Sequence, residues 1–582
     1  MATNEAIAAA LSEFADLLEL SGANPFKVNA FRRASRACEA VPSDLAIWAR
    51  SEKSKLREIE GVGESTANHI VEFVTLGKIP DLERLRSEVP AGLPPLLTLQ
   101  GLGPKTVRVL WESAKVTSLE GLKAALDEGK LDAIPGMGAK KIANIREAVE
   151  ARLAAGDAPV RHRLGQAVPI AEALLARLML VPGTQRAQYA GSARRGRETV
   201  GDLDLLVSST NPEAVRKAFV ALPDVAKVLA SGETRCSVLL HPGIQVDLRV
   251  VEDAAFGAAL LYFTGSKDHN VRLRERSIAR GMRLNEYGLF HEPHRSETPP
   301  TEIVAAASEP EIYAALELPY WPPELRESDG LDAITATPRL IELADIKSEL
   351  HSHTNASDGD LTIDELANLA KSRGFHTLAV TDHSKASAQA NGLSVERLLR
   401  HIDAIREAEA RVGGIRLLAG SEVDILADGR LDYDDETLAK LDLVVASPHT
   451  ALRQDPAAAT RRLLAAIRHP LVHILGHPTG RIVGGREGLS PDMDALYAAA
   501  KECSTALEIN SHWMRLDLRD VHVRGAVNAG CLIAIDCDTH RPADADNLRY
   551  GIATARRGGL APESCVNTWT QPRLLTWLKS KR

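Results

Sequence analysis

The order of three short motifs restricts the fold of this chain more than any other feature of its sequence. Gly-Ser-Ala-Arg-Arg-Gly at 191–196 is followed by Asp202 and Asp204 in an apolar run, and later by Asp247 in a β-branched run. Side chains two apart on a strand point to the same face, so Asp202 and Asp204 project together. If the run around Asp247 forms a neighbouring strand, three carboxylates meet on one face. Because carboxylates repel one another, such a cluster is stable mainly when cations bind in it.

This arrangement suits phosphoryl transfer. Hard divalent ions such as Mg²⁺ take oxygen ligands and usually complete their coordination with substrate phosphates. Two ions about 3.5–4 Å apart hold the attacking and the leaving oxygen of such a reaction. The Gly191–Ser192 turn adds a flexible backbone and a hydroxyl, and Arg194 and Arg195 supply the charge of a phosphate clamp. The order of motifs therefore predicts a nucleotidyltransferase site rather than an acidic strand edge with surface charges.

This stretch resembles the palm of the family X DNA polymerases, the family of DNA polymerase beta. A second block strengthens the resemblance: Tyr-Phe-Thr-Gly-Ser at 262–266, then Asn270, Arg274 and Asn-Glu-Tyr at 285–287. Two positions depart from the animal enzyme, because Lys267 and Gln245 replace an acidic and a basic residue.

The resemblance implies a role for each matching residue. Catalysis and the binding of two Mg²⁺ or Mn²⁺ ions fall to Asp202, Asp204 and Asp247. Nucleotide binding falls to Ser192, Arg195, Gly201, Tyr262, Phe263, Gly265 and Asn270, with Ser192 and Arg195 on the triphosphate. Arg274 is expected to reach the template strand.

Composition sets the wider limits. The chain has 582 residues, of which 45% are apolar and 25% charged, so we expect a globular protein of several domains. It shows neither a bilayer-spanning apolar run nor a signal-peptide pattern, which favours a cytoplasmic protein with no membrane partner. A nucleoid-associated monomer is the further expectation. The six scattered cysteines form no Cys-x-x-Cys, so neither disulfides nor a thiolate zinc site are expected.

Net charge and its local distribution point in different directions. The formal net charge of −8 is unlike that of a nucleic-acid binder, but bound metal ions change the local sign of carboxylate sites. Six basic residues lie between 267 and 283, beside the second polymerase-like block. A solvated helix face has the same pattern; next to this block we interpret it as a face that follows phosphates.

Three Gly-x-Gly turns lie between predicted helices in the first part of the chain. A helix begins after each one, and the middle residue is always apolar. Glycine lets backbone amides at a helix N-terminus approach an anion closely. The repeats resemble helix-hairpin-helix motifs, which hold the DNA backbone without reading sequence; the alternative is three ordinary turns. The predicted DNA-binding glycines are Gly61, Gly63, Gly101, Gly103, Gly136 and Gly138.

One activity of the animal enzyme is not expected. Its first domain removes 5′-deoxyribose phosphate through a lysine Schiff base, and the matching position here, counted from the first Gly-x-Gly, is His69. Imidazole cannot form the Schiff base that a primary amine forms. We therefore predict weak or absent lyase activity by this route.

After a proline-rich segment, the pattern becomes α/β. Short apolar runs at 377–381, 415–419, 441–446, 472–475, 505–509 and 531–535 alternate with alanine-rich helices, which predicts a parallel barrel or sheet. Polar residues gather at the ends of these runs, where barrels build active sites. Imidazole with carboxylate suits Zn, Mn and Fe, and such a site binds phosphate and activates water. The predicted metal ligands are His351, His353, Asp358, His383, Glu422, His449, His477, Asp538 and His540.

This half resembles the PHP (polymerase and histidinol phosphatase) domain, a distorted (β/α)₇ barrel with three metal ions, here Mn²⁺, Zn²⁺ or Fe. All nine ligand positions of that family hold acceptable residue types, which favours an active domain. Arg481, in Gly-His-Pro-Thr-Gly-Arg at 476–481, is expected to contact phosphate.

The fold class follows: helical helix-hairpin-helix domains, an α+β nucleotidyltransferase palm with a helical thumb, and an α/β barrel. The predicted domains are an N-terminal helix-hairpin-helix domain at 1–95, helix-hairpin-helix fingers at 96–157, the palm at 158–255, the thumb at 256–318, a proline-rich linker at 319–345 and the PHP domain at 346–582.

The order of domains resembles bacterial family X polymerases. It implies a base excision repair enzyme that fills short gaps in gapped or nicked DNA with dNTPs and processes ends by a metal-dependent 3′–5′ exonuclease, with AP endonuclease or 3′-phosphatase activity as further possibilities. Three alternatives stay open: a PHP nuclease or phosphatase whose polymerase half only binds DNA, a scaffold with vestigial sites, and a template-independent transferase.

Overall fold

The structure is a computed structural model with two compact units, Met1–Pro159 and Val160–Arg582. Each unit is described by itself. The structure describes residues 4–581 except 42, 100–101, 133, 135–136, 139–140, 144, 147–148, 151–152, 154–160, 233–234, 242, 292–302 and 328–335.

The first unit is helical. Its described helices pack around one apolar cluster that extends from Ile7 to Val149, so the two predicted regions 1–95 and 96–157 share a core. The helices are α1 (Asn4–Leu20), α2 (Pro25–Ala40), α3 (Leu45–Ser51), α4 (Lys53–Leu56), α5 (Glu64–Leu76), α6 (Pro80–Glu88), α7 (Pro104–Ala114) and α8 (Leu119–Asp127), with a 3₁₀ turn η1 at Pro94–Thr98.

The second unit begins with the palm, a five-stranded sheet in the order β2-β4-β7-β6-β5. The run that carries Asp202 and Asp204 pairs in parallel with the run that carries Asp247, which confirms the expected neighbouring strands. The strands are β2 (Thr184–Tyr189), β4 (Asp202–Ser209), β5 (Val225–Ser231), β6 (Arg235–Leu240) and β7 (Gln245–Val251); β1 (His162–Arg163) pairs separately with β3 (Thr199–Val200).

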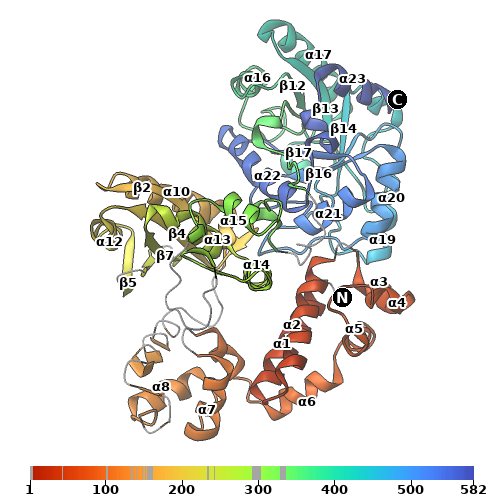
Figure 1. Ribbon diagram of the computed structural model, residues 1–582. Coiled ribbons are helices and arrows are strands. Elements are labelled where there is room, and N and C mark those ends of the chain that lie inside the picture. Colours follow the sequence, from red (N-terminus) through yellow and green to blue (C-terminus); the bar gives the residue numbers. More distant parts are fainter. Residues whose placement is uncertain are drawn as a thin grey trace. The chain divides into compact units, whose positions relative to one another are not determined.

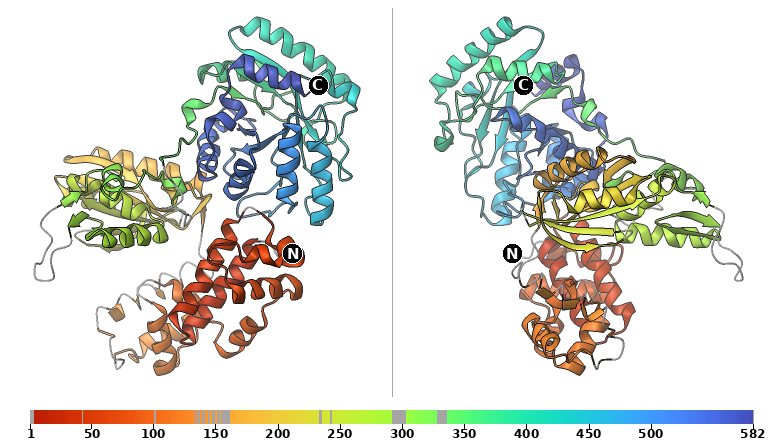
Figure 2. Two further views of the ribbon diagram at one scale, coloured as in Figure 1. Left: turned by 45° about the vertical axis from the view of Figure 1, so that its right-hand side comes forward. Right: turned by 90° about the vertical axis from the view of Figure 1, so that its left-hand side faces the viewer.

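Helices lie against the palm sheet (Figure 2). The alternation of side chains along its strands gives the sheet two faces. Leu203, Leu205 and Val207 pack in one cluster with residues of α10 (Leu164–Met179) and α12 (Pro212–Val220). Leu206 faces the other way, against Phe256 of α13 (Phe256–Thr264). Asp202 and Asp204 share the parity of Leu206, so the acids lie on the α13 face and not in the larger apolar core.

The thumb combines helices with a small antiparallel sheet in the order β10-β9-β8. Its elements after α13 are α14 (Lys267–Ala279), β8 (Met282–Asn285), β9 (Gly288–His291), β10 (Ile303–Ala305) and α15 (Glu309–Ala315). The predicted linker 319–345 begins inside this packing, because Trp321 is buried in the thumb cluster and Arg326 is fully buried. The first part of that segment therefore belongs to the thumb structure.

A buried ion-pair cluster ties the palm to the thumb. Glu309 accepts two hydrogen bonds from Arg194, at 2.8 and 2.7 Å, and one from Arg326 at 2.7 Å. Burial alone would raise the pKa of Glu309, but Arg326 and Arg194 outweigh it and lower the pKa to about 2. These ion pairs explain why Glu309 is buried. From the sequence alone, an acidic residue before Pro310 looks like an ordinary start of a helix.

The C-terminal part is a parallel barrel (Figure 1). The described strands follow the chain in the order β11 to β17, and a bridge between Ser352 and Thr539 brings the first and last edges together. The expected distorted (β/α)₇ barrel is confirmed, and the first strand, a two-residue element, is the one that the apolar runs did not reveal. The strands are β11 (Ser348–Glu349), β12 (Thr377–Val380), β13 (Arg416–Asp424), β14 (Leu443–Ser447), β15 (Ile474–Leu475), β16 (Ala506–Asn510) and β17 (Ile533–Asp536).

Helices surround the barrel strands in the sequence order that right-handed β-α-β crossovers require. They are α16 (Ile363–Ser372), α17 (Val395–Val412), α18 (Asp435–Leu438), α19 (Pro456–Ile467), α20 (Met493–Cys503), α21 (Asp520–Ala529), α22 (Leu548–Arg557) and α23 (Gln571–Ser580). No helix in the described part of the chain has the length and apolar character needed to cross a membrane.

The barrel packs directly on the polymerase-like half of its unit. Leu516 and Tyr550 of the barrel join the apolar cluster of the palm. Around them, arginines of the barrel pair with glutamates of the palm and thumb: Arg481 with Glu198 at 2.6 Å, Arg549 with Glu172 at 2.9 Å, Arg556 with Glu324 at 2.7 Å and Arg557 with Glu327 at 3.3 Å.

Glu309→Gln should destabilise this unit, because it leaves two buried guanidiniums without a counter-charge. We expect a loss of about 3–5 kcal/mol in the free energy of unfolding at pH 7, measured by denaturant titration. A carboxylate with a lowered pKa stabilises above its unfolded pKa, so the gap to wild type should shrink as the pH falls from 4.5 towards 2. The exposed Glu311→Gln on the same helix is the control, with an expected change within about 0.5 kcal/mol; equal effects of both variants would contradict the assignment.

Candidate active sites

The first candidate site is the acidic face of the palm. Asp204 lies opposite Asp247 in the parallel pairing of β4 and β7, and Asp202 lies two residues before it on the same face. Burial, followed by the charges of Asp202 and Asp247, raises the pKa of Asp204 to about 7. Burial and Asp247 also raise the pKa of Asp202. A site that holds protons this firmly favours a bound cation, and three carboxylates fit a hard divalent ion such as Mg²⁺ or Mn²⁺.

The Gly191 turn is built directly on this acid cluster. Gly191 has φ +61°, and a Cβ there would lie 2.2 Å from Oδ2 of Asp204. The amide of Ala190 also donates a 2.8 Å hydrogen bond to the carbonyl oxygen of Asp204. The turn therefore requires glycine, and it places the half-buried Ser192 next to the acidic face.

Asp247 has partners that sequence reasoning missed. Arg235 of β6 donates to its Oδ2 at 2.7 Å, Ser237 donates to Oδ1, and Gln245 donates to Oδ1 at 3.3 Å. No local motif marks Arg235; only the β6–β7 pairing, which sets Ser237 opposite Asp247, brings it to the site. Arg235 thus supplies a positive charge at Asp247, close to the position where Gln245 replaces a basic residue of the animal enzyme.

The two arginines of the motif have different surroundings. Arg194 donates to Glu309 and, at 2.6 Å, to Thr264 Oγ1, so its guanidinium serves the palm–thumb ion pair in this structure. The phosphate clamp expected at Arg194 stays a prediction. Arg195 donates to Glu327 at 2.8 Å and to the carbonyl oxygen of Thr264. Gly265, at φ +68°, lies beside it, and a Cβ there would come 3.2 Å from Arg195 Nη1.

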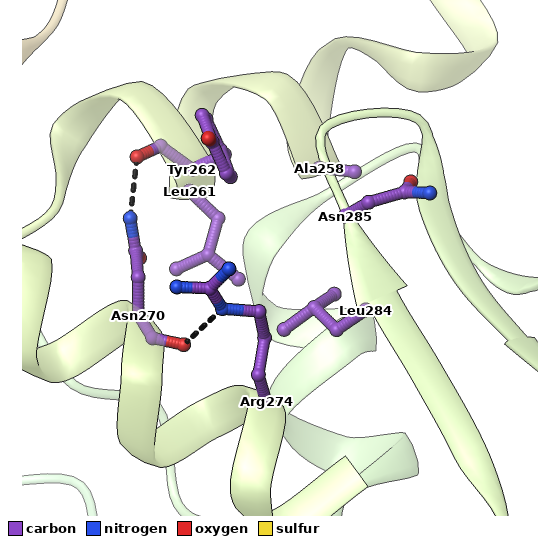
Figure 3. Close-up of a pocket in the computed structure, with 7 residues that line it drawn as sticks. All are labelled: Ala258, Leu261, Tyr262, Asn270, Arg274, Leu284 and Asn285. Carbon is purple, nitrogen blue, oxygen red and sulfur yellow. Dashed lines mark hydrogen bonds between the residues drawn. The ribbon is translucent and has the colours of Figure 1, made fainter. Parts of the chain in front are cut away.

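A pocket between α13, α14 and β8 brings together three predicted residues of the nucleotide and template contacts (Figure 3). Asn270 Nδ2 donates to the carbonyl oxygen of Tyr262 at 2.6 Å, and Arg274 Nε donates to that of Asn270 at 3.3 Å. Phe263 lies outside this pocket, under the guanidinium of Arg249 at 4.9 Å. The residues that line the pocket are Ala258, Leu261, Tyr262, Asn270, Arg274, Leu284 and Asn285.

Two arginines of the basic stretch 267–283 form contacts within the thumb. Arg276 Nε donates to the carbonyl oxygen of Leu316 at 2.9 Å, and Arg280 pairs with Glu317. These two arginines hold the end of α15, so the phosphate-following face does not include their side chains in this state. Arg274 is exposed at the pocket, as its predicted contact with DNA requires.

The Gly-x-Gly turns in the first unit form open helix starts. Gly63 caps α5 and Gly103 caps α7, both in extended conformation and without a side-chain cap. A Cβ at Gly63, Gly103 or Gly138 would meet nothing within 4 Å. The apolar middle residues, Val62, Leu102 and Met137, are buried. Free amides at an open helix start suit a phosphate. Gly61 completes the first turn at φ +91°, Gly201 is exposed beside Asp202, and Gly101 and Gly136 lie outside the described residues.

His69 is packed as an aromatic side chain. Its ring meets Phe14 at 5.2 Å and Phe31 at 5.4 Å, and Nδ1 lies 2.6 Å from the carbonyl oxygen of Ser65. The position that would need a free amine holds a ring enclosed by phenyl groups. The prediction of weak or absent lyase activity by this route stands unchanged.

The second candidate site lies at the carboxyl ends of the barrel strands. All nine predicted ligands meet there: eight of them form three overlapping groups, and His477 joins through Glu422, with Nε2 2.9 Å from Oε1. The groups are His353, Asp358, His383 and His540; His351, His353, Glu422 and Asp538; and His383, Glu422 and His449.

Many atoms of this cluster are buried without a hydrogen-bond partner in the described part of the chain. Such orphaned atoms are rare in proteins unless an ion or water satisfies them. Their chemistry, imidazole nitrogen with carboxylate oxygen, fits Mn²⁺, Zn²⁺ or Fe. They are His351 Nε2, both ring nitrogens of His353 and His477, His383 Nδ1, both oxygens of Glu422 and Asp538 Oδ1.

The titration of the cluster also indicates a demand for positive charge. Burial would raise the pKa of Glu422, but the imidazoles of His449 and His351 outweigh it and hold the pKa well below its usual range. Burial would lower the pKa of His449, but Glu422 outweighs it and raises the pKa to about 10. Glu422 is therefore stabilised as an anion by positive charge around it, which is the kind of charge that a bound metal ion supplies.

Two carboxylates behind the ligands were missed by the sequence reasoning. Glu508 lies 2.6 Å from His351 Nδ1, and Asp424 lies 3.0 Å from His449 Nδ1. Each turns the opposite ring nitrogen towards the cluster, as partners of metal-bound histidines do. A signal exists in retrospect: Asp424 follows Glu422 by two residues on one strand, and Glu508 is the single charge in an apolar strand.

Arg481 does not face this cluster as expected. It donates to Glu198 of the palm at 2.6 Å and to the carbonyl oxygen of Leu516 at 2.7 Å, and it is buried. In this structure the side chain belongs to the contact between barrel and palm, and its phosphate contact stays a prediction.

A palm with an acidic cluster, joined to a barrel with a histidine-rich metal cluster, defines a class of protein that combines a nucleotidyltransferase with a metal-dependent phosphoesterase. Family models match four parts of the chain: a helix-hairpin-helix domain at 2–79, a SAM-like helix-hairpin-helix tandem at 93–151, a DNA polymerase beta thumb at 259–327 and a PHP domain at 349–512.

Similarity to one relative extends over the full length. The DNA polymerase/3′-5′ exonuclease PolX of Bacillus subtilis (strain 168) is 38% identical over 573 residues, 98% of each chain. The chain is also similar to a probable phosphatase of Syntrophotalea carbinolica, 27% identical over 233 residues, 38% of this chain and 90% of that protein. The chain belongs to the family X DNA polymerases that carry a C-terminal PHP domain.

Glu508→Gln should weaken metal binding at the barrel about 10–100-fold, because His351 loses the charged partner that orients it. The measurement is metal content of the purified protein during titration with a chelator. Glu502→Gln, an exposed position on α20, is the matched control. Retention of metal equal to that of the control would exclude a role for Glu508.

Gly63→Ala and Gly103→Ala should each weaken binding of gapped DNA about fivefold, since a methyl group would separate the open amides from a phosphate. Their extended conformation tolerates alanine, so thermal stability should not change. Gly121→Ala, inside α8, is the control that leaves the turns intact. Fluorescence anisotropy with labelled DNA measures the effect, and unchanged affinity would assign these turns a purely structural role.

Proposed function

We propose that this chain is a base excision repair enzyme that fills short DNA gaps by template-directed dNTP addition and processes DNA ends with its barrel. The observation that carries the proposal is the presence of two cation-demanding clusters on one chain: Asp202, Asp204 and Asp247 on the palm, and nine ligands in the barrel. The relative from Bacillus subtilis is named for both activities, a DNA polymerase and a 3′–5′ exonuclease.

In the proposed polymerase reaction, Asp202, Asp204 and Asp247 hold two Mg²⁺ or Mn²⁺ ions. When bound, such ions lower the pKa of the primer 3′-hydroxyl and neutralise the leaving pyrophosphate. Ser192 and Arg195 bind the triphosphate, and Gly191 keeps their turn against Asp204. Arg235 holds Asp247 in place on the adjacent strand.

The incoming nucleotide is proposed to lie beside the pocket of Figure 3. Tyr262 and Asn270 line its edge, and their mutual hydrogen bond orients both. Phe263, Gly201 and Gly265 do not line this pocket and are proposed to contact the nucleotide elsewhere in the site. Arg274, exposed at the same pocket, contacts the template strand.

The barrel is proposed to act as a 3′–5′ exonuclease, with its nine ligands holding three ions of Mn²⁺, Zn²⁺ or Fe. When bound, such ions supply a hydroxide at neutral pH and neutralise phosphate charge. Glu508 and Asp424 orient His351 and His449 for this purpose. Because shorter relatives are named probable phosphatases, removal of a 3′-phosphate and AP endonuclease activity remain part of the proposal.

The substrate is proposed to be gapped or nicked DNA together with dNTPs, bound by a monomer. The open helix starts at Gly63, Gly103 and Gly138 support contacts with the phosphate backbone. We place the enzyme with the nucleoid in the cytoplasm, where such DNA lies.

A second function, a PHP nuclease whose polymerase half only binds DNA, is favoured by one observation. Arg195, the proposed triphosphate ligand, is paired with Glu327 in the structure. One experiment distinguishes the two proposed functions: a gapped, 5′-labelled DNA is incubated with the protein and Mn²⁺ or Mg²⁺, with and without dNTPs. Extension with dNTPs and shortening without them support the two-activity enzyme; shortening alone assigns the polymerase half to binding.

Asp204→Ala should abolish nucleotide addition and leave nuclease activity, whereas His351→Ala should do the reverse. The reason is that each substitution removes one ligand from one cluster, and the clusters share no residue. The same gapped-DNA assay measures both, and each variant is the control for the other. A parallel loss of both activities in either folded variant would contradict two independent sites.

A further inference from the structure

The proposed triphosphate ligand is in contact with the barrel. Arg195 Nε donates to Oε1 of Glu327 at 2.8 Å, and Nη1 of Arg557, from the last turn of α22, approaches the same oxygen at 3.3 Å. Arg557 also donates from Nη1 to the backbone carbonyl oxygen of Arg195 at 2.8 Å. One carboxylate thus lies between two arginines that are more than three hundred residues apart in the sequence.

On the barrel side, Arg557 is buried and held by an ion pair with Asp520. Arg557 is only 4% exposed, and its Nε and Nη2 each lie 2.7 Å from Oδ2 of Asp520. Asp520 is in turn influenced by Arg519, so Arg557 is not its only counter-charge. Arg197 reaches Glu327 Oε1 from the palm at 4.0 Å.

The backbone of the triphosphate turn rests on the same barrel helix. Gly196 has φ +66°, and a Cβ there would lie 3.1 Å from the Cβ of Ala553, one turn before Arg557. The turn 191–197 is therefore held between Asp204 on one side and α22 on the other.

Charge explains why this matters for nucleotide binding. Arg195 and Glu327, 2.8 Å apart, form a neutral pair, which attracts a triphosphate only weakly. Arg197 lies farther from Glu327, at 4.0 Å, and is partly exposed, so it compensates the carboxylate less than the buried Arg557 at 3.3 Å. With Arg557 on the same carboxylate, the positive charge of Arg195 is left in excess.

We propose that Arg557 makes the barrel a functional part of the polymerase site: it is a positioning residue that neutralises Glu327, so that Arg195 binds the incoming dNTP. This inference rests on the proposed gap-filling function. It assigns to the barrel a role in nucleotide affinity that is separate from its own metal cluster, because Arg557 is not among the nine ligands.

The test compares steady-state gap filling by Arg557 variants with and without the Glu327 carboxylate. Arg557→Ala should raise the KM for dNTP about tenfold with kcat nearly unchanged, because ground-state binding of the triphosphate is weakened. Arg557→Lys, which keeps the charge, should stay within about threefold of wild type. In Glu327→Gln/Arg557→Ala the carboxylate is gone, so KM should return to near the wild-type value.

The control is Arg556→Ala on the same helix. Arg556 pairs with Glu324 at 2.7 Å, so its loss also removes an ion pair between barrel and thumb but leaves Arg195 untouched. Its KM should not change, and 3′–5′ degradation without dNTPs should be equal in all four variants.

Two results would overturn the inference while wild type fills gaps: an unchanged KM in Arg557→Ala, or a raised KM that Glu327→Gln does not restore. The second would mean that Arg557 only stabilises the contact between the halves. If wild-type protein fails to extend the primer, the proposed function itself fails and this inference with it.

Discussion

Buried charge that must be matched by opposite charge is the constraint on which the rest of this structure depends. In the palm, burial and then the charges of Asp202 and Asp247 raise the pKa of Asp204 to about 7. In the barrel, Glu422 is surrounded by imidazoles, and several of their buried nitrogens have no hydrogen-bond partner in the described residues. Elsewhere, as at Glu309, the chain supplies the opposite charge itself. Where the chain does not supply the opposite charge, we expect metal ions to supply it.

The features that could be predicted from the sequence are those set by local repeats, such as the alternation of side chains along a strand. Alternation along a strand places Asp202 and Asp204 on one face without knowledge of any partner. Polar residues after apolar runs in a β/α repeat meet at one end of a barrel, which brought the nine ligands together as expected. The glycines of the helix-hairpin-helix turns belong to the same class, because an open helix start is a local property.

What could not be predicted depends on pairing between distant segments. Arg194 looks like a phosphate ligand in its motif, but the thumb brings Glu309 to it, and the guanidinium is used there. Arg235 reaches Asp247 only through the register of β6 on β7. Arg481 follows a barrel ligand closely in sequence, yet Glu198 of the palm takes its charge. In each case a long arginine side chain can reach several partners, and the sequence does not show which one it pairs with.

The contact between barrel and palm has a consequence for dissecting the enzyme into pieces. Glutamates of the polymerase half point at arginines of the barrel, around an apolar centre that includes Leu516 and Tyr550. A polymerase half produced without the barrel would carry an uncovered apolar surface ringed by negative charge, on the same side as its triphosphate turn. Negative charge at that edge would disfavour both DNA and dNTP. Activities measured on such fragments would therefore combine the loss of binding caused by the exposed surface with the chemistry of each half.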